Sequence, residues 1–285
     1  MTSLPSSFET GRGLRLEFHR PIFMGILNVT PDSFSDGGSY ANVEAVVRQA
    51  QKLVDDGATI LDIGGESSRP GSDPVGAEEE CNRVLPAIDA LLDANLSAAI
   101  SIDTTKAVVA DKAASRGAEF INDISALSDP NMAQIAAKHE TGLILMHMRG
   151  TPKTMQAGPI HYDNVTREVT HHLNKAIVQA QEAGVLKERI WIDPGIGFGK
   201  NLEHNLDLTR SIGELTETGC RILYGPSRKR FLGEITGRDV TDRDRATAAA
   251  CAIAAYEGAD IFRVHDVGAV HDAITVGYAL RTNPR

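Results

Sequence analysis

The sequence predicts an α/β protein with a single (β/α)₈ (TIM) barrel, and three observations lead to that prediction. Short apolar runs alternate with helical patterns along the whole chain, eight such runs can be counted, and 285 residues suit one barrel of this kind. Near-continuous apolar strands that alternate with helices form parallel sheets covered by helices. An open doubly wound sheet is the competing architecture, and the lack of a GxGxxG motif after the first strand weakens it.

The eight expected strands follow one another at short intervals. They are PIFMGILNV (21–29), TILDIGG (59–65), SAAISIDTT (97–105), EFINDIS (119–125), GLILMHM (142–148), RIWIDPG (189–195), RILYGPS (221–227) and DIFRVHDV (260–267). Helices are expected between them, with apolar faces such as Val43, Val46, Val47, Ala50, Leu53 and Val54, or Val165, Val169, Leu173, Ala176, Ile177 and Ala180. Glycines in DDGAT, SRGAE and YEGAD are expected to cap helices in the left-handed conformation and pass the chain to the next strand.

Two segments are expected, an N-terminal arm over residues 1–19 and one barrel domain over residues 20–285. The arm is expected to be loose, and GLRLEFH could add a short strand to it. It lacks a basic start followed by an apolar block, so no signal peptide is expected.

Composition limits the partners of the protein. A net charge of −9 argues against nucleic acid or an anionic membrane as the main partner. No apolar run approaches the roughly 18 residues of a membrane span. Cys81, Cys220 and Cys251 are scattered and lack CxxC spacing, which is typical of a reduced cytoplasmic protein without a disulfide framework or a zinc site.

Polar residues gather at the C-terminal ends of the expected strands. They are Asn28, Asp62, Asp103, Asn122, Asp123, His147, Asp193, Arg263 and His265. Any one of them is more often a helix cap or a turn former, and Asp62 could equally brace the barrel floor. In a barrel, however, these ends converge on one mouth, so the set as a whole predicts a small-molecule site there.

The polar groups are of two chemical kinds. The acceptors Asp103, Asn122 and Asp193 suit a flat heterocycle with amino and amide edges, because a carboxylate can accept two parallel N–H bonds. The cationic or titratable groups suit phosphate oxygens, and they are Arg69, Lys229, Arg263 and His265. A ligand with a polar ring and an anionic tail would use both kinds.

Four further stretches are unusual or easily misread. GGESSRPGSDPVG (64–76) is long for a connecting loop, and long loops are more often functional than short ones. DPGIGFGK (193–200) lacks the GK[ST] ending of a nucleotide-binding loop. GPSRKRFLG (225–233) has three basic residues after the seventh strand, where barrels often bind phosphate. The Ala-rich segment 246–259 predicts a smooth helix for a dimer interface or the barrel wall, whereas His171 and His172 are expected to be surface residues.

Eight motifs resemble those of bacterial dihydropteroate synthases, in the same order and spacing. They are NVTPDSFSDGG (28–38), GGESSRPG (64–71), SID (101–103), IND (121–123), LMHM (145–148), DPGIGFGK (193–200), SRKRFLG (227–233) and RVHDV (263–267). The resemblance covers residues 20 to 280. It implies a pterin-binding barrel that condenses 6-hydroxymethyl-7,8-dihydropterin diphosphate with 4-aminobenzoate, giving 7,8-dihydropteroate and diphosphate in tetrahydrofolate biosynthesis. It also implies a Mg²⁺ cofactor and a cytoplasmic homodimer.

The resemblance assigns roles to individual residues. The pterin is expected at Asp103, Asn122, Met146, Asp193, Lys229 and Arg263. The diphosphate is expected at Asn28, Ser68, Arg69, Arg263 and His265, with Asn28 also binding the metal. The 4-aminobenzoate is expected at Phe34, Ser68, Pro70, Phe198 and Arg230. The residues expected to take part in catalysis are Asp36, Arg69, Lys229, Arg263 and His265.

The polar stretch after the first strand is interpreted as a mobile lid. Phe34 and Asp36 would complete the second-substrate site, and Gly37 and Gly38 would be hinges. Changing Asp36 to Ala is therefore expected to lower turnover far more than pterin binding. Turnover and pterin affinity measured on the same variant test this, and undiminished turnover would remove the role assigned to the lid.

The chain departs from the family at two positions, and three alternative functions remain open. At position 68 the family often has Thr where this chain has Ser, so the hydroxyl is kept. At position 230 it often has Ser where this chain has Arg, whose guanidinium could still meet the aminobenzoate carboxylate. The alternatives are a methyltetrahydrofolate-dependent methyltransferase barrel, a non-catalytic pterin-binding paralogue, and a sugar-phosphate isomerase barrel, since fold does not fix function.

Overall fold

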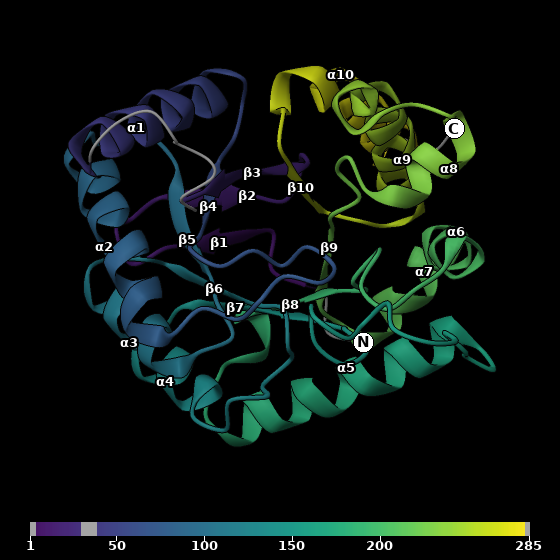
Figure 1. Ribbon diagram of the computed structural model, residues 1–285, viewed down its shortest axis with the longest axis horizontal. Coiled ribbons are helices and arrows are strands. Elements are labelled where there is room, and N and C mark those ends of the chain that lie inside the picture. Colours follow the sequence, from purple (N-terminus) through teal and green to yellow (C-terminus); the bar gives the residue numbers. More distant parts are fainter. Residues whose placement is uncertain (1–3, 30–38, 283–285) are drawn as a thin grey trace.

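The computed structural model describes residues 4–29 and 39–282 and has a closed barrel of eight parallel strands at its centre. Neighbouring strands follow the order β10-β3-β4-β5-β6-β7-β8-β9 around the barrel, and the helices surround it (Figure 1). The predicted (β/α)₈ barrel is confirmed, and the doubly wound alternative is excluded because the sheet closes on itself.

All eight predicted strands are present, each shorter than its apolar run. They are β3 (Ile22–Asn28), β4 (Ile60–Gly64), β5 (Ala99–Asp103), β6 (Phe120–Asp123), β7 (Gly142–Met146), β8 (Ile190–Asp193), β9 (Arg221–Tyr224) and β10 (Ile261–Val264). The α-helices are α1 (Ser39–Asp55), α2 (Ala77–Asp93), α3 (Ala107–Ser115), α4 (Met132–Lys138), α5 (Val165–Glu182), α6 (Leu202–Arg210), α7 (Ile212–Leu215), α8 (Arg230–Thr236), α9 (Asp244–Glu257) and α10 (Val267–Thr282).

The strand register brings several of the predicted polar residues into one row. Asn28 pairs with Gly64, Gly64 with Asp103, and Asp103 with Asn122. On the opposite wall Met146 pairs with Asp193. Residues distant in sequence thus meet at the C-terminal rim, which is the position that parallel strands in a barrel impose.

Two apolar layers hold the barrel together. One set of strand side chains points into the barrel, where Met24, Phe120 and Trp191 are fully buried. The alternate set points outward and packs against the helices, including Leu53 of α1 and Leu173 of α5. Because both faces are covered, the strands are apolar throughout rather than alternating.

The N-terminal segment is an ordered hairpin from Leu4 onward, so the expectation of a loose arm was wrong. Strands β1 (Ser7–Glu9) and β2 (Arg15–Glu17) pair antiparallel. Phe8 and Phe18 lie edge-on to Trp191, with ring centroids 5.7 and 5.9 Å away. The hairpin closes the N-terminal end of the barrel and buries aromatic side chains that short, polar-flanked sequences do not reveal.

The predicted helix faces and caps are confirmed. The residues expected to face the core in α5 are buried, and Gly57, Gly117 and Gly258 have φ of +108°, +111° and +134° where their helices end.

Among residues 4–29 and 39–282, no helix has the length and apolar character needed to span a membrane.

Candidate active site

At the floor of the barrel mouth, one arginine side chain is paired with two carboxylates. Arg263 of β10 donates from Nε to Asp62 Oδ2 at 2.6 Å and from Nη2 to Asp103 Oδ2 at 2.6 Å. Asn122 of β6 donates from Nδ2 to the same Asp62 oxygen at 3.0 Å. Asp62 is fully buried, so it braces the floor and orients both Arg263 and Asn122.

Burial and charge set the protonation of these groups. Burial raises the pKa of Asp103 to about 7, although Arg263 pulls it down. Burial also raises the pKa of Asp193, against the pull of Lys229. Burial works against the charge on Arg263, but Asp62 and Asp103 outweigh it and raise its pKa. The floor therefore combines a permanent cation with carboxyl groups able to accept hydrogen bonds near neutral pH.

The opposite wall is formed by the ends of β8 and β9. Asp193 Oδ1 accepts a hydrogen bond from the Gly195 amide at 2.7 Å. Lys229 donates to the carbonyl of Ile196, and its ammonium lies 4.5 Å from the centroid of the Phe198 ring. Burial lowers the pKa of Lys229 to about 8, although Asp193 opposes this. A cation, a carboxyl group and an aromatic face thus meet on one side of the mouth.

Met146 and Phe198 share a small apolar cluster on this side. They are 2% and 8% exposed and pack with Ile124 and Met155. The cluster adds apolar side chains beside the polar floor, a combination typical of small-molecule sites.

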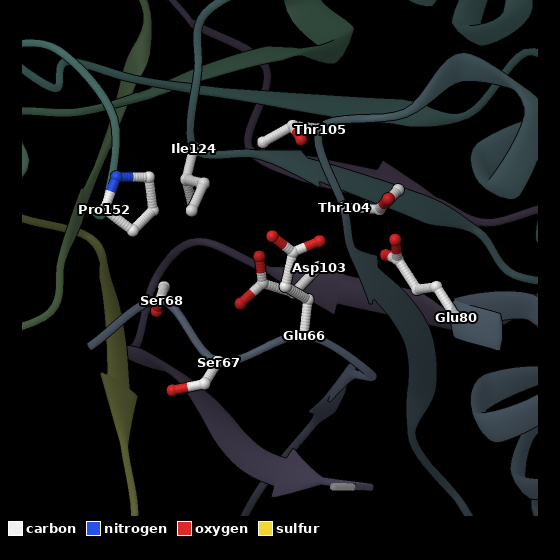
Figure 2. Close-up of a pocket in the computed structure, with 9 residues that line it drawn as sticks. All are labelled: Glu66, Ser67, Ser68, Glu80, Asp103, Thr104, Thr105, Ile124 and Pro152. Atoms are coloured by element: carbon white, nitrogen blue, oxygen red, sulfur yellow. The ribbon is translucent and has the colours of Figure 1, made fainter. Parts of the chain in front are cut away.

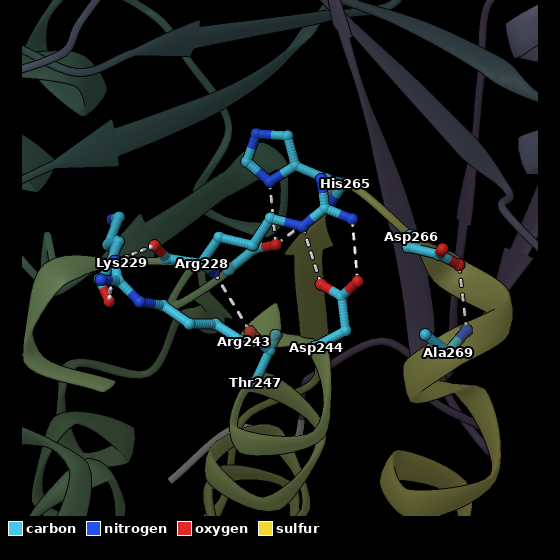
Figure 3. A network of polar contacts seen from close by, with 9 residues as sticks. Arg228, Lys229, Arg243, Asp244, Thr247, His265, Asp266 and Ala269 are labelled. Carbon is cyan, nitrogen blue, oxygen red and sulfur yellow. Dashed lines mark hydrogen bonds and ion pairs between the residues drawn. The ribbon is translucent and has the colours of Figure 1, made fainter. Parts of the chain in front are cut away.

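The three consecutive basic residues after β9 separate into three environments. Arg228 forms a two-bond ion pair with Asp244 at the start of α9, Nε–Oδ1 2.7 Å and Nη2–Oδ2 2.8 Å (Figure 3). Lys229 points toward the mouth, where it contacts the Ile196 carbonyl and the Phe198 ring. Arg230 begins α8, where its 86% exposed side chain pairs with Glu234. The run is therefore not a uniformly solvated charge cluster.

The backbone of this segment is strained and tied down. Arg228 has φ +58°, which is rare for a residue with a side chain. Its amide donates to Thr247 Oγ1 at 3.1 Å, and its carbonyl accepts from Arg243 Nη1 at 3.1 Å (Figure 3). The anchoring by α9 holds the conformation that directs Lys229 into the mouth.

His265 follows β10 and is fixed by Ser227. Its Nδ1 lies 2.9 Å from Ser227 Oγ, and its amide donates to that oxygen at 3.1 Å. Burial, with the nearby charges of Arg263, Arg228 and Arg69, lowers its pKa to about 4. It is therefore a neutral imidazole at neutral pH and acts as a hydrogen-bonding group rather than as a fixed cation.

The loop after β4 borders a pocket next to Asp103. The pocket is lined by Glu66, Ser67, Ser68, Glu80, Asp103, Thr104, Thr105, Ile124 and Pro152 (Figure 2). Ser68 is half-buried on its wall, whereas Arg69 and Pro70 are exposed at the rim. The structure thus brings Ser68 to Asp103 but leaves the neighbouring two residues at the edge of the mouth.

Asn28 lies at the end of β3 and is partly exposed. A Cβ placed on Gly64 would be 3.9 Å from Asn28 Oδ1 and 3.7 Å from Asp103 Oδ2, so oxygen atoms of both side chains lie beside this glycine. No group of three His, Cys, Asp or Glu residues within the described ranges could hold a metal ion. Phe34 and Asp36 lie outside the described residues, as do Gly37 and Gly38.

Sequence reasoning missed the buried partner of His147. Lys200 is 3% exposed, and its ammonium lies 2.9 Å from His147 Nδ1 and donates to the Phe198 carbonyl at 3.1 Å. Burial lowers the pKa of Lys200 to about 7 and that of His147 to about 2. The motif DPGIGFGK contains this lysine, but its burial could not be inferred without the fold.

Asp123, by contrast, is a turn former. It accepts hydrogen bonds from the amides of Ser125 at 2.9 Å and Leu127 at 2.7 Å, so both oxygens are used locally. The plainer of the two interpretations of this strand-end carboxylate is therefore the correct one.

Comparisons with known proteins agree with this geometry. The family described as "Pterin binding enzyme" matches residues 24–265. A dihydropteroate synthase of Haemophilus influenzae is 42% identical over 264 residues, 93% of this chain and 95% of that protein. A Xanthomonas albilineans dihydropteroate synthase with 4-aminobenzoic acid is 44% identical with a TM-score of 0.90, covering 98% of this chain and 99% of that one. The Xanthomonas albilineans enzyme in complex with 7,8-dihydropteroate is 42% identical with a TM-score of 0.85, covering 96% and 98%.

Proposed function

Because the chain belongs to the pterin-binding enzymes, and among them to the dihydropteroate synthase family, we propose that it condenses 6-hydroxymethyl-7,8-dihydropterin diphosphate with 4-aminobenzoate. The products are 7,8-dihydropteroate and diphosphate. The enzyme is a transferase of folate biosynthesis, and its substrates are small molecules.

The observation that carries this proposal is the convergence of acceptors and cations at one barrel mouth. Asp103, Asn122 and Asp193 offer acceptors from three strands, and Arg263 and Lys229 stand among them. A pterin has an amino-amide edge with parallel N–H donors, which buried carboxyl groups can accept. The apolar cluster with Met146 and Phe198 supports a planar ring beside them.

The reaction breaks the bond between the pterin methylene carbon and a diphosphate oxygen, and forms a bond from that carbon to the amine nitrogen. The electron-rich pterin can stabilise a developing positive charge on the methylene carbon, so the leaving group can depart ahead of attack. Arg263 and Arg69 supply fixed positive charge for the departing diphosphate, and neutral His265 supplies a hydrogen bond. The arylamine needs orientation rather than deprotonation before attack, and its proton leaves to solvent afterwards.

We propose Mg²⁺ as the cofactor, held by Asn28 together with the substrate diphosphate. A single protein oxygen fits this ion, since Mg²⁺ in phosphate sites takes most ligands from water and phosphate. Asn28 is partly exposed, and its Oδ1 and Asp103 Oδ2 both lie beside Gly64, so a cation there would meet oxygen atoms. When bound, the metal would neutralise charge on the leaving diphosphate.

The second substrate is proposed to bind between the rim loops. Ser68 and Pro70 come from the loop after β4, Phe198 from the loop after β8, and Arg230 from the start of α8. Arg230 could exchange its exposed partner Glu234 for the aminobenzoate carboxylate, because an exposed ion pair of this kind is worth only about 0.3–0.5 kcal/mol.

Purified protein given the pterin diphosphate, with and without 4-aminobenzoate, tests the function. We expect dihydropteroate and diphosphate to form in equal amounts, and both to stop when Mg²⁺ is chelated and resume when it is restored. Diphosphate release at the same rate with and without 4-aminobenzoate would contradict the condensation. Pterin binding without product would instead favour a non-catalytic paralogue.

We further propose a homodimer in the cytoplasm. Ile253 and Tyr256 on α9 and Val276 and Leu280 on α10 are 53%, 54%, 59% and 64% exposed. A Cβ on Gly277 would lie 2.2 Å from the Ala252 carbonyl oxygen, so the two helices touch between these side chains. Exposed apolar side chains on two adjoining helices support self-association. Three free, buried cysteines within the described ranges support a reducing compartment.

A further inference from the structure

The β4–α2 loop (residues 65–76) carries Ser68, Arg69 and Pro70, and half of its residues are exposed. A loop that must present side chains to a substrate needs anchors at its ends. The anchor at its start is an ion network that joins Glu66 and Glu80, two residues lining the pocket of Figure 2, through Lys106, a residue with no role in the proposed reaction.

Lys106 connects three elements through its ammonium group. It donates to Glu66 Oε2 in the β4–α2 loop and to Glu80 Oε2 of α2 at 2.6 Å. Lys106 itself precedes α3. Burial works against its charge, but the bonds to Glu66 and Glu80 outweigh this and raise its pKa, so it stays cationic.

Glu80 makes this link costly to break and therefore rigid. Its side chain is fully buried, and its other oxygen has no hydrogen-bond partner in the described part of the chain. Lys106 is thus the cation that compensates a buried carboxylate. If Lys106 moved away, the buried charge of Glu80 would be left without a partner. The position of the Lys106 ammonium is fixed by the protein interior, and Glu66 attaches the loop to it.

Two backbone contacts also hold this loop, at Gly65 and Gly71, and they do not replace the ion pair of Glu66. Arg83 Nη1 donates to the Gly65 carbonyl at 2.8 Å, which holds only the first residue of the loop. At the far side the Gly71 amide donates to the Pro152 carbonyl at 3.0 Å. Between these points Glu66 provides the side-chain contact to the protein interior, directly before Ser67 and Ser68.

We propose that Glu66 and Lys106 are positioning residues for the 4-aminobenzoate side of the site, because they fix the loop of residues 65–76. This inference rests on the proposed function. The pterin floor is built on strands and does not depend on the loop. Loss of the link therefore raises the KM for 4-aminobenzoate and lowers kcat/KM for it by about 10- to 100-fold, while pterin affinity changes little.

Glu66→Gln is the main test variant, because it leaves the Lys106–Glu80 pair intact. Steady-state kinetics with 4-aminobenzoate varied, and calorimetric titration with 6-hydroxymethylpterin, separate the two substrates. Asp73→Asn is the matched control: it removes the same charge from the same loop, but its pair with Lys153 is exposed, so we expect a change within about twofold.

Two more variants test Lys106 itself. Lys106→Arg keeps the charge and reach and should stay near the wild type. Lys106→Met is combined with Glu80→Gln so that no buried charge is left alone, and it should reproduce the KM increase of Glu66→Gln. Adding Glu66→Gln to that pair should then have little further effect, because the same link is already lost.

An unchanged KM for 4-aminobenzoate in Glu66→Gln would overturn the inference, as would an equal loss of pterin affinity. Hydrogen exchange of residues 66–72 gives a readout that does not need activity, and it should speed up in Glu66→Gln but not in Asp73→Asn. If the wild type forms no dihydropteroate, the proposed function fails, while the exchange result still decides whether Glu66 and Lys106 order the loop.

Discussion

At the scale of single residues, Arg263 organises the floor of the mouth. Its guanidinium reaches Asp62 and Asp103 at the same time, each at 2.6 Å. Its planar group directs two N–H donors along fixed lines, one toward each of two carboxylates held on different strands. In the proposed reaction, the arginine would set the position of an acceptor for the pterin and provide charge for the diphosphate.

Arg263→Lys is expected to lower kcat/KM by at least about 100-fold, because lysine lacks the fixed two-donor geometry that fits Asp62 and Asp103 and has fewer N–H groups left for the leaving diphosphate. Arg263→Met should also destabilise the fold by about 3–5 kcal/mol, since two buried carboxyl groups lose their cation. Kinetics and urea unfolding measure the two effects. Arg281→Lys is the control, because Arg281 pairs with Asp260 and the Ala259 carbonyl and makes no contact with the floor; a comparable loss there would contradict the assignment.

Lys200 is a second residue whose environment has a measurable consequence. Its pKa falls from the ordinary 10.5 to about 7 because burial disfavours the charged form. The unfolded chain therefore binds more protons than the folded chain between these pH values. It follows that this residue makes the protein more stable as the pH rises from about 7 toward 10.5.

Lys200→Met should remove this contribution to the pH dependence. Urea unfolding of both proteins at pH 7, 8 and 9 should show the wild type gaining stability relative to the variant as the pH rises, by at most about 1.4 kcal/mol per pH unit. If the unfolding free energy of the wild type minus that of the variant stays constant or falls as the pH rises, Lys200 is not held in the folded state with a depressed pKa.

At the scale of elements, the connection between β8 and α6 depends on a close approach of two backbones. Gly195 has φ +69°, and a Cβ there would lie 1.8 Å from the carbonyl oxygen of His147. The segment also carries Phe198 and is tied by Lys200 to the end of β7. Positive φ and the absence of a side chain are both required here.

Gly195→Ala is expected to destabilise the protein by at least about 3 kcal/mol, because strain in the left-handed region adds to a backbone clash. Gly158→Ala is a matched control, since Gly158 has the same φ of +69° with open space around it, and it should cost only about 1 kcal/mol. Equal costs in denaturant unfolding would mean that the approach to His147 is not restrictive.

At the scale of the whole molecule, the two last helices shape an outer surface away from the barrel mouth. They lie against each other (Figure 1), and they carry the exposed apolar side chains of Ile253, Tyr256, Val276 and Leu280. The closed barrel itself has no free sheet edge, and the exposed apolar side chains of α9 and α10 offer a helical face for self-association.

Tyr256→Glu combined with Leu280→Glu is expected to convert the proposed dimer into a monomer without unfolding it, because four carboxylates would be buried at the proposed two-fold interface. Light scattering after size-exclusion chromatography gives the mass, and circular dichroism checks the fold. Val178→Glu, at a 52% exposed apolar residue of α5, is the matched control and should stay dimeric. A monomeric wild type would contradict the proposed homodimer.

The sequence alone determined the barrel, its eight strands and the gathering of Asp103, Asn122, Asp193 and Arg263 at one rim. Apolar runs, helical periodicity and helix-ending glycines are local signals, and the convergence of parallel strand ends follows from them. The predicted helix faces of α1 and α5 are confirmed for the same reason: their periodicity reports burial directly.

Only the tertiary structure decided the contacts between residues far apart in the chain. Arg263 and Asp62 are separated by 201 positions, Lys200 and His147 by 53, and Glu66 and Lys106 by 40. Which strand-end carboxylate braces a neighbour, which lysine is buried, and whether the N-terminal segment plugs the barrel all depend on packing. Sequence patterns record the burial of one element at a time, whereas charge pairing and pKa depend on distances that exist only once the barrel has closed.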